Sequence, residues 1–155
     1  MMSVPRLNID LDKIYENTRI LVERLTDRGI AVTGITKATL GSADIAAALL
    51  LGGVRALGDS RIENIEAMRH ASISASMTLI RTPMLSQAAR VVAQSDISFN
   101  TELRVIKKLS QAAQEEPSCT ASFSWSNLEI SRHTALVRIV SLHGRPWPPM
   151  YARRK

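Results

Sequence analysis

The chain has 155 residues, of which 20 are lysine or arginine and 14 are aspartate or glutamate, so its formal net charge at pH 7 is +6. This length supports one ordinary domain but is short for a complete (β/α)₈ barrel, which needs roughly 250 residues. The single cysteine excludes a disulfide framework and a multi-cysteine zinc site, so no metal is expected. No apolar run approaches the ~20 residues that span a bilayer, and the N-terminus lacks the apolar core of a signal peptide. We therefore expect a cytoplasmic protein without a membrane partner.

The charge is concentrated at the C-terminal end. Residues 1–116 hold 14 basic and 13 acidic side chains, whereas residues 117–155 hold six basic side chains and one acidic one. Both tryptophans and the only cysteine also lie after residue 116. A shift in composition of this size indicates a boundary, so we expect a domain over residues 1–116 and an atypical basic tail over residues 117–155.

Before residue 117, segments typical of strands alternate with segments typical of amphipathic helices. The predicted strands are short and alternating or β-branched, namely Arg6–Leu11, Ile30–Lys37, Val54–Leu57, Met77–Arg81 and Asp96–Asn100. A helix is predicted after each strand from apolar residues at three- and four-residue spacing. Four helix starts carry capping signals: Asp10 and Ser42 as N-caps, a capping box over Ser60–Glu63, and Pro83 at the first helical position.

This alternation predicts an α/β fold with a parallel sheet built from right-handed strand-helix-strand units. The expected strand ends are about 20 residues apart, near Lys37, Gly58, Arg81 and Asn100. Units this compact resemble half of a (β/α)₈ barrel more than a doubly wound sheet, although periodicity alone does not separate the two. Neither a dinucleotide-binding glycine motif nor a P-loop follows any predicted strand.

Lys37 is the first candidate for chemistry because it ends a predicted strand, and the carboxyl ends of parallel strands carry the active sites of this fold class. The period of two places it on the same face as Thr33 and Ile35. If that face lines a barrel, desolvation would make the amine a usable nucleophile toward an aldehyde. The alternative is a solvated lysine at a strand end.

Four motifs, in a fixed order along the chain, favour the first of these two interpretations of Lys37. They are PRLNIDLDKIYENTRILVERL, VTGITKATLG, GVRALGDSRIENI and DISFNTEL, and they extend from about Pro5 to about Glu116. Together they resemble the N-terminal domain of the alanine racemase superfamily, the pyridoxal 5'-phosphate (PLP) enzymes of fold type III. TKA and GDSRIENI are most similar to the alanine/ornithine racemase branch. The resemblance implies a partial (β/α)₈ PLP-binding barrel, with a leading strand and helix and about the first half of the barrel. It also implies that Lys37 forms the internal aldimine with PLP and exchanges protons with an amino acid.

The resemblance also implies that Ser60 and Arg61 lie near the cofactor, since they belong to a strand-end motif of the family. The capping box explains Ser60 equally well without a ligand. Asn100 ends a further strand motif and is a candidate cofactor-binding residue. The alternative for Asn100, with Thr101, is an N-cap for the next helix.

Three functions remain open. The first is part of a PLP-dependent amino-acid racemase, typically dimeric in this family. We expect the chain alone to be inactive, because racemisation needs a second acid/base group that the family supplies from later sequence. The alternative is a non-catalytic PLP-binding protein of the same barrel superfamily. The third is a nucleic-acid binder, suggested only by Arg153–Lys155 with Trp147 and Tyr151, and no known nucleic-acid module supports it.

The composition after residue 116 predicts a shifted reading frame, and the alternative is a genuine divergent or disordered tail. A barrel strand is due there, yet Ala121–Ser126 is a poor candidate for a buried strand. We assumed codons for Ala121–Ile130 and translated them in the frame that starts one nucleotide earlier. The resulting residues can include an apolar strand followed by an acidic-Leu-Gly-Asp turn. This is similar to the strand that the family places next. We therefore expect a poorly ordered tail with at most one strand against the preceding sheet. Arg132, His133 and His143 are accordingly not assigned catalytic roles.

Overall fold

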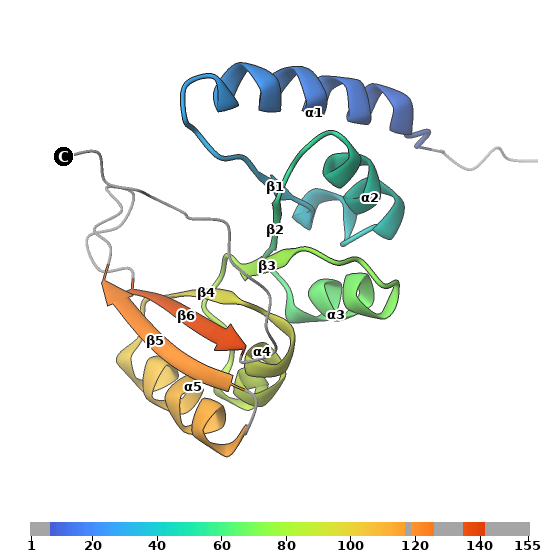
Figure 1. Cartoon of the computed structure of the whole chain (residues 1–155). Helices are drawn as coiled ribbons and strands as arrows, with labels where there is room; N and C mark the ends of the chain where they lie inside the picture. The colour runs from blue at the N-terminus through green and yellow to red at the C-terminus, as the bar shows by residue number, and fades with distance from the viewer. Residues whose placement is uncertain (1–6, 117–118, 126–134, 142–155) are drawn as a thin grey trace, which may run out of the picture.

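The computed structural model describes residues 7–116, 119–125 and 135–141, with side-chain surroundings for residues 7–116 (Figure 1). The hypotheses on the basic tail depend on residues outside this described part of the chain, namely Arg132, His133, His143, Arg145, Trp147, Tyr151 and Arg153–Lys155.

Helices and strands alternate as far as residue 115, and two described strands follow. The helices are α1 (Leu11–Thr26), α2 (Ala43–Leu51), α3 (Ile62–His70), α4 (Ala88–Gln94) and α5 (Leu103–Glu115), with 3₁₀ turns η1 (Lys37–Thr39) and η2 (Leu85–Gln87). The strands are β1 (Thr33–Ile35), β2 (Ala56–Asp59), β3 (Ser76–Leu79), β4 (Ile97–Asn100), β5 (Cys119–Trp125) and β6 (Ala135–Ser141).

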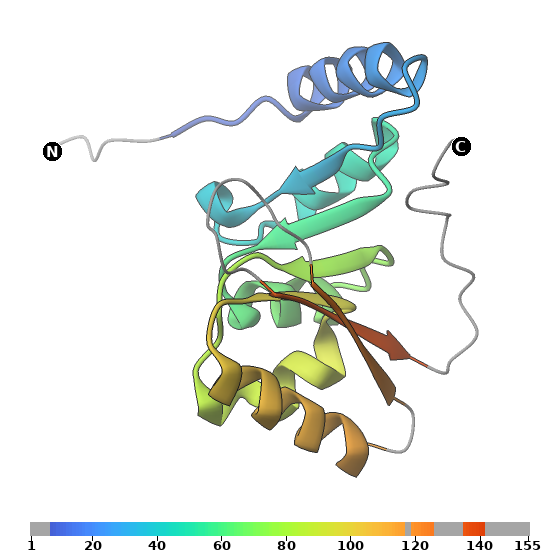
Figure 2. The ribbon, with the colours of Figure 1, turned by 90° about the vertical axis from the view of Figure 1, so that its left-hand side faces the viewer.

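The six strands form one sheet in the order β1-β2-β3-β4-β6-β5. Strands β1 to β4 pair in parallel and in chain order, and a helix connects each strand to the next. Strand β6 runs antiparallel to β4, and β5 runs antiparallel to β6 (Figure 2). The four parallel units confirm the predicted α/β class and its interpretation as part of a (β/α)₈ barrel.

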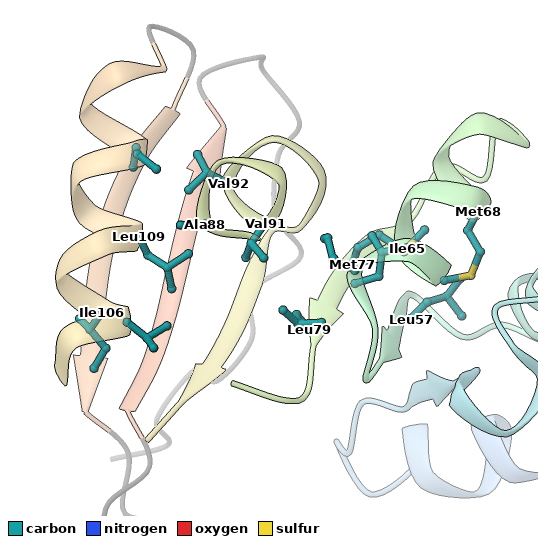
Figure 3. Close-up of a cluster of buried hydrophobic side chains, with 14 of the residues drawn as sticks. Leu57, Ile65, Met68, Met77, Leu79, Ala88, Val91, Val92, Ile106 and Leu109 are labelled. Carbon is teal, nitrogen blue, oxygen red and sulfur yellow. The ribbon is translucent and has the colours of Figure 1, made fainter. Parts of the chain in front are cut away.

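The core lies between one face of the parallel strands and the helices that connect them. Leu57 of β2 and Met77 of β3 are neighbours in the sheet, and both are fully buried against Ile65 and Met68 of α3 (Figure 3). The same cluster continues through Leu79 to α4 and α5. Burying one such side chain contributes about 1.5–3 kcal/mol, so this face of the sheet carries most of the packing energy.

Helix α1 packs on α2 at the β1 end of the molecule (Figures 1 and 2). Asp10 caps it as predicted, because its carboxylate accepts a hydrogen bond from the Lys13 backbone N–H at 3.1 Å. Gly52 permits the close approach of the two helices, since a Cβ atom there would lie 2.7 Å from the Thr18 Cβ.

Two local predictions away from Lys37 and Ser60 are wrong. Residues 7–10, within the predicted strand Arg6–Leu11, form no strand: no described strand pairs with them, and Leu7 is 86% exposed. Pro83 does not open a helix. The first helical turn after β3 is η2, where the Gln87 side chain accepts a hydrogen bond from the Met84 N–H at 3.0 Å, and α4 follows only from Ala88.

The described part of the tail contributes a two-stranded antiparallel hairpin, and only its second strand, β6, pairs with a strand that precedes residue 117. This hairpin lies beside β4, where a parallel barrel would continue with a further parallel strand. The division of the chain at residue 117 stays a prediction.

Candidate functional site

The predicted site residues follow neighbouring strands at a single edge of the sheet, which we call the carboxyl edge. In the strand register Ile35 pairs with Gly58, and Asp59 pairs with Leu79. Lys37 comes two residues after Ile35, and Ser60 comes two residues after Gly58. The two residues therefore lie at the same level beyond the ends of β1 and β2. The carboxyl edge therefore brings Lys37 and Ser60 onto adjacent strand ends.

Lys37 does not end a strand but opens the turn η1, two residues beyond Ile35. Burial alternates through this segment: Thr33, Ile35 and Lys37 are exposed, whereas Gly34 and Thr36 are buried against the helices. Lys37 thus continues the face of β1 that no helix covers. No described residue forms a hydrogen bond or an ion pair with its ammonium group, so this amine is available to a ligand.

Ser60 and Arg61 connect β2 to α3, but the predicted capping box is not formed. The N-cap of α3 is Arg61, and no side chain hydrogen-bonds to the helix start from that position. Instead the Asp59 carboxylate accepts the Arg61 backbone N–H at 3.0 Å. The helix start is thus held by Asp59, one residue before the predicted cap, and the half-buried Ser60 hydroxyl has no capping role.

Asn100 lies apart from these residues. Leu79, a core residue, pairs with Ser98, so Ser98 and Asn100 lie on the helix-covered face of the sheet rather than on the face of Lys37. The Asn100 amide is fully buried and donates to the Ser98 carbonyl at 3.0 Å. It is not a helix cap either, because the N-cap of α5 is Glu102. Its contact with a cofactor stays a prediction.

A pocket of about 860 Å³ opens beyond the ends of β2 and β3 and includes both Ser60 and Arg61. The further residues that line it come from α3, the segment after β3, and the start of α5 (Ile62, Glu63, Leu79, Arg81, Thr82, Pro83, Met84, Leu85, Ser86, Gln87, Glu102, Arg104 and Val105).

Two arginines of this pocket are available to an anion. Glu63 is paired with Arg90 at 3.1 Å, and the Arg90 side chain also holds the pKa of Glu66 below its usual range by hydrogen bonding to it. Glu102 pairs with Arg104 within the pocket. Arg61 and Arg81 have no hydrogen-bonded or ionic partner among the side chains that the structure describes, so the pocket presents two unpaired guanidinium groups.

Comparison with known proteins decides the family. Residues 9–123 match the family described as alanine racemase, N-terminal domain. The chain belongs to this family. The resemblance carried by the TKA and GDSRIENI motifs is thereby confirmed, and the match continues past Glu116 into β5.

Two relatives in the alanine racemase N-terminal domain family are similar over most of the chain. A protein named lysine racemase from Thermotoga maritima is 39% identical over 114 residues, which cover 74% of this chain and 32% of that protein. A protein named ornithine racemase from Acetoanaerobium sticklandii is 30% identical over 110 residues, which cover 71% of this chain and 31% of that protein. The chain thus spans about a third of the length of these relatives.

Two further findings concern only the described residues. None of their helices is long and apolar enough to cross a membrane. Nor does this part of the chain contain a group of three His, Cys, Asp or Glu side chains arranged to hold a metal ion.

Sequence reasoning missed three polar residues at the carboxyl edge. Thr36 and Asp59 are both fully buried, immediately before Lys37 and Ser60, and Arg81 lines the pocket. The position of Arg81 at the end of a predicted strand was a usable signal, since it repeats the placement of Arg61. Thr36 and Asp59 lie within the TKA and GDSRIENI motifs, which was a usable signal, although a threonine and an aspartate at strand ends usually serve turns.

Proposed function

We propose that this chain is the cofactor-anchoring part of a PLP-dependent amino-acid racemase, with Lys37 as the residue that holds PLP covalently. The observation that carries the proposal is the exposed, unpartnered amine of Lys37, on the uncovered face of the first parallel strand, in a family that includes proteins named lysine racemase and ornithine racemase.

The residues of the carboxyl edge fit this cofactor. The Lys37 amine can bond to its aldehyde carbon, and the unpaired Arg61 and Arg81 can bind an anionic group of the cofactor or of the substrate. The Ser60 hydroxyl can donate a hydrogen bond from the adjacent strand end. When bound, PLP supplies an electron sink for the pair left on the substrate Cα. The ε-amine of Lys37 would accept or return the proton on one face of that carbon.

The proposed substrate is a small amino acid, with lysine, ornithine and alanine as the candidates to test. The names of the two relatives favour a basic side chain. We further propose that the protein acts in the cytoplasm and as a dimer, without a membrane or nucleic-acid partner. The alternative function, a PLP-binding protein without catalysis, uses the same Lys37 and differs only in its turnover of amino acids.

The proposal predicts that PLP added to the purified chain produces a new absorption band and that borohydride then fixes one PLP per chain covalently. Absorption spectroscopy and intact mass measure both effects. Pyridoxamine 5'-phosphate, which lacks the aldehyde, is the matched control and should be removed completely by gel filtration. A folded chain that binds PLP only reversibly after borohydride treatment would contradict the proposal.

We also propose that the end of the chain, from about residue 117, is translated in a shifted reading frame. The change in composition at residue 117 supports this proposal, whereas the family match itself continues to residue 123. It predicts that the coding DNA, read one nucleotide earlier, encodes an apolar strand, an acidic-Leu-Gly-Asp turn and further family sequence. Sequencing the gene tests this directly, and an early stop codon in that frame would contradict it.

A further inference from the structure

Two fully buried polar side chains lie directly beneath the turn that carries Lys37. Thr36 precedes Lys37 in the chain, and Asp59 lies opposite Thr36 at the end of β2. The Thr36 hydroxyl donates to the Asp59 carboxylate at 2.7 Å, and the Thr36 backbone N–H donates to the Gly58 carbonyl at 2.9 Å. The end of β1 is therefore tied to β2 by a backbone bond and by a charge-assisted side-chain bond.

The Asp59 carboxylate also binds the start of α3, which carries Arg61. Its second oxygen accepts the Arg61 backbone N–H at 3.0 Å and the Asn64 side-chain amide at 2.9 Å. Three donors thus converge on Asp59, from the residue after β1, from the N-cap of α3 and from the first turn of α3. A buried carboxylate is costly unless it is satisfied in this way, so removing any one donor is expected to loosen the group.

Thr36 also holds the turn η1 and the loop after it, through its backbone carbonyl. Its carbonyl oxygen accepts the Thr39 N–H at 2.9 Å and the Gly41 N–H at 3.3 Å, which closes the loop on either side of Lys37. Gly41 has a positive φ of 68°, and a Cβ atom there would lie 2.7 Å from the Asn64 Cβ. The loop therefore packs closely on α3, through the residue whose amide Asp59 also binds.

We propose that Asp59 and Thr36 are positioning residues that fix the direction in which Lys37 presents its ε-amine. The inference rests on the proposed function of Lys37. Neither residue reaches the reacting atoms, because both lie on the helix-covered face of the sheet, opposite the face that Lys37 continues. One carboxylate thereby sets the relative placement of Lys37 and of Ser60 and Arg61, the two sides of the candidate site.

The test compares Thr36→Val, which keeps the shape of the side chain and removes its hydroxyl, with Thr36→Ser, which restores a hydroxyl. Amide hydrogen exchange measured by NMR reports on the turn without any cofactor. Exchange of the Thr39 and Gly41 amides should accelerate roughly tenfold or more in Thr36→Val, the scale expected for a lost hydrogen bond to a charged group. In Thr36→Ser the exchange rates of these two amides should be close to those of the unsubstituted chain. Thr78→Val, a buried threonine on β3, is the matched control and should leave both amides unchanged.

The second readout is the rate at which PLP becomes fixable at Lys37 by borohydride. It should fall in Thr36→Val and recover in Thr36→Ser. Unchanged exchange in Thr36→Val would overturn the inference, and so would faster exchange with an unchanged rate of fixation, since the bond would then be merely structural. If the unsubstituted chain fixes no PLP, the proposed function of Lys37 is wrong. Amide hydrogen exchange of Thr39 and Gly41 then still tests whether Thr36 and Asp59 hold the turn.

If Thr36→Val does not fold by circular dichroism, Asn64→Ala keeps the inference falsifiable. Asn64 is partly exposed, and its loss removes one of the three donors to Asp59. Faster exchange at Thr39 and Gly41, of smaller size than for Thr36→Val, would support the shared anchor. Exchange rates equal to those of the unsubstituted chain would overturn it.

Discussion

Replacing Lys37 with alanine should abolish the covalent fixation of PLP by borohydride while leaving the protein folded. Lys37 is exposed and has no described partner, so the free energy of unfolding should change by less than about 0.5 kcal/mol. Intact mass after borohydride measures the fixation, and urea denaturation measures the stability. Loss of the label without loss of stability separates a role in the site from a role in the fold.

The matched control is the double substitution Lys107→Ala with Lys108→Ala. These two lysines are exposed on α5, away from the carboxyl edge of β1, so the double variant should be labelled as well as the unsubstituted chain. Full labelling of the Lys37→Ala chain would contradict the assignment of Lys37.

The second large effect that we expect is a slow exchange of the substrate Cα proton with solvent. The chain alone should exchange this proton in lysine, ornithine or alanine about 10²–10⁴-fold more slowly than full-length family members, the usual loss when one acid/base group is missing. Lys37 is the only amine that the described strand ends β1 to β4 place at the carboxyl edge, and racemisation needs a proton donor on each face of the carbon. Deuterium incorporation from D₂O, followed by mass spectrometry, measures the rate.

The Lys37→Ala chain supplies the baseline for this measurement. Slow exchange above that baseline supports the racemase, whereas exchange at the baseline favours the alternative of a PLP-binding protein without catalysis. Rapid exchange that depends on Lys37 would show that one described amine suffices, against our expectation.

The parallel fold could be predicted from sequence because each unit is local. Short apolar strands, followed by helices with apolar residues at helical spacing, specify β1 to β4 and their helices nearly in place. Other parts of the fold depend on a distant partner. The stretch before α1 alternates like a strand, but nothing pairs with it among the described strands, and the β5–β6 hairpin depends on antiparallel pairing to β4 that no local pattern encodes.

The candidate site could be predicted in part for the same reason. The period of two was enough to place Lys37 on the face of Thr33 and Ile35, since that argument needs only β1. It could not place Asn100, because the face of Asn100 depends on the register between β3 and β4. The capping box at Ser60 failed because α3 has its N-cap one residue later, at Arg61, and the buried Asp59 carboxylate holds the helix start through the Arg61 N–H and the Asn64 amide. The local Ser60–Glu63 motif does not reveal where the helix begins.

Peptide mapping of the chain after PLP and borohydride treatment tests the central claim most directly. The chain is digested, and the phosphopyridoxyl group is located by tandem mass spectrometry. The account predicts a single labelled peptide containing Thr36, Lys37 and Ala38, with the label on the Lys37 side chain. A label on Lys107 or Lys108, with Lys37 unmodified in the folded chain, would contradict it.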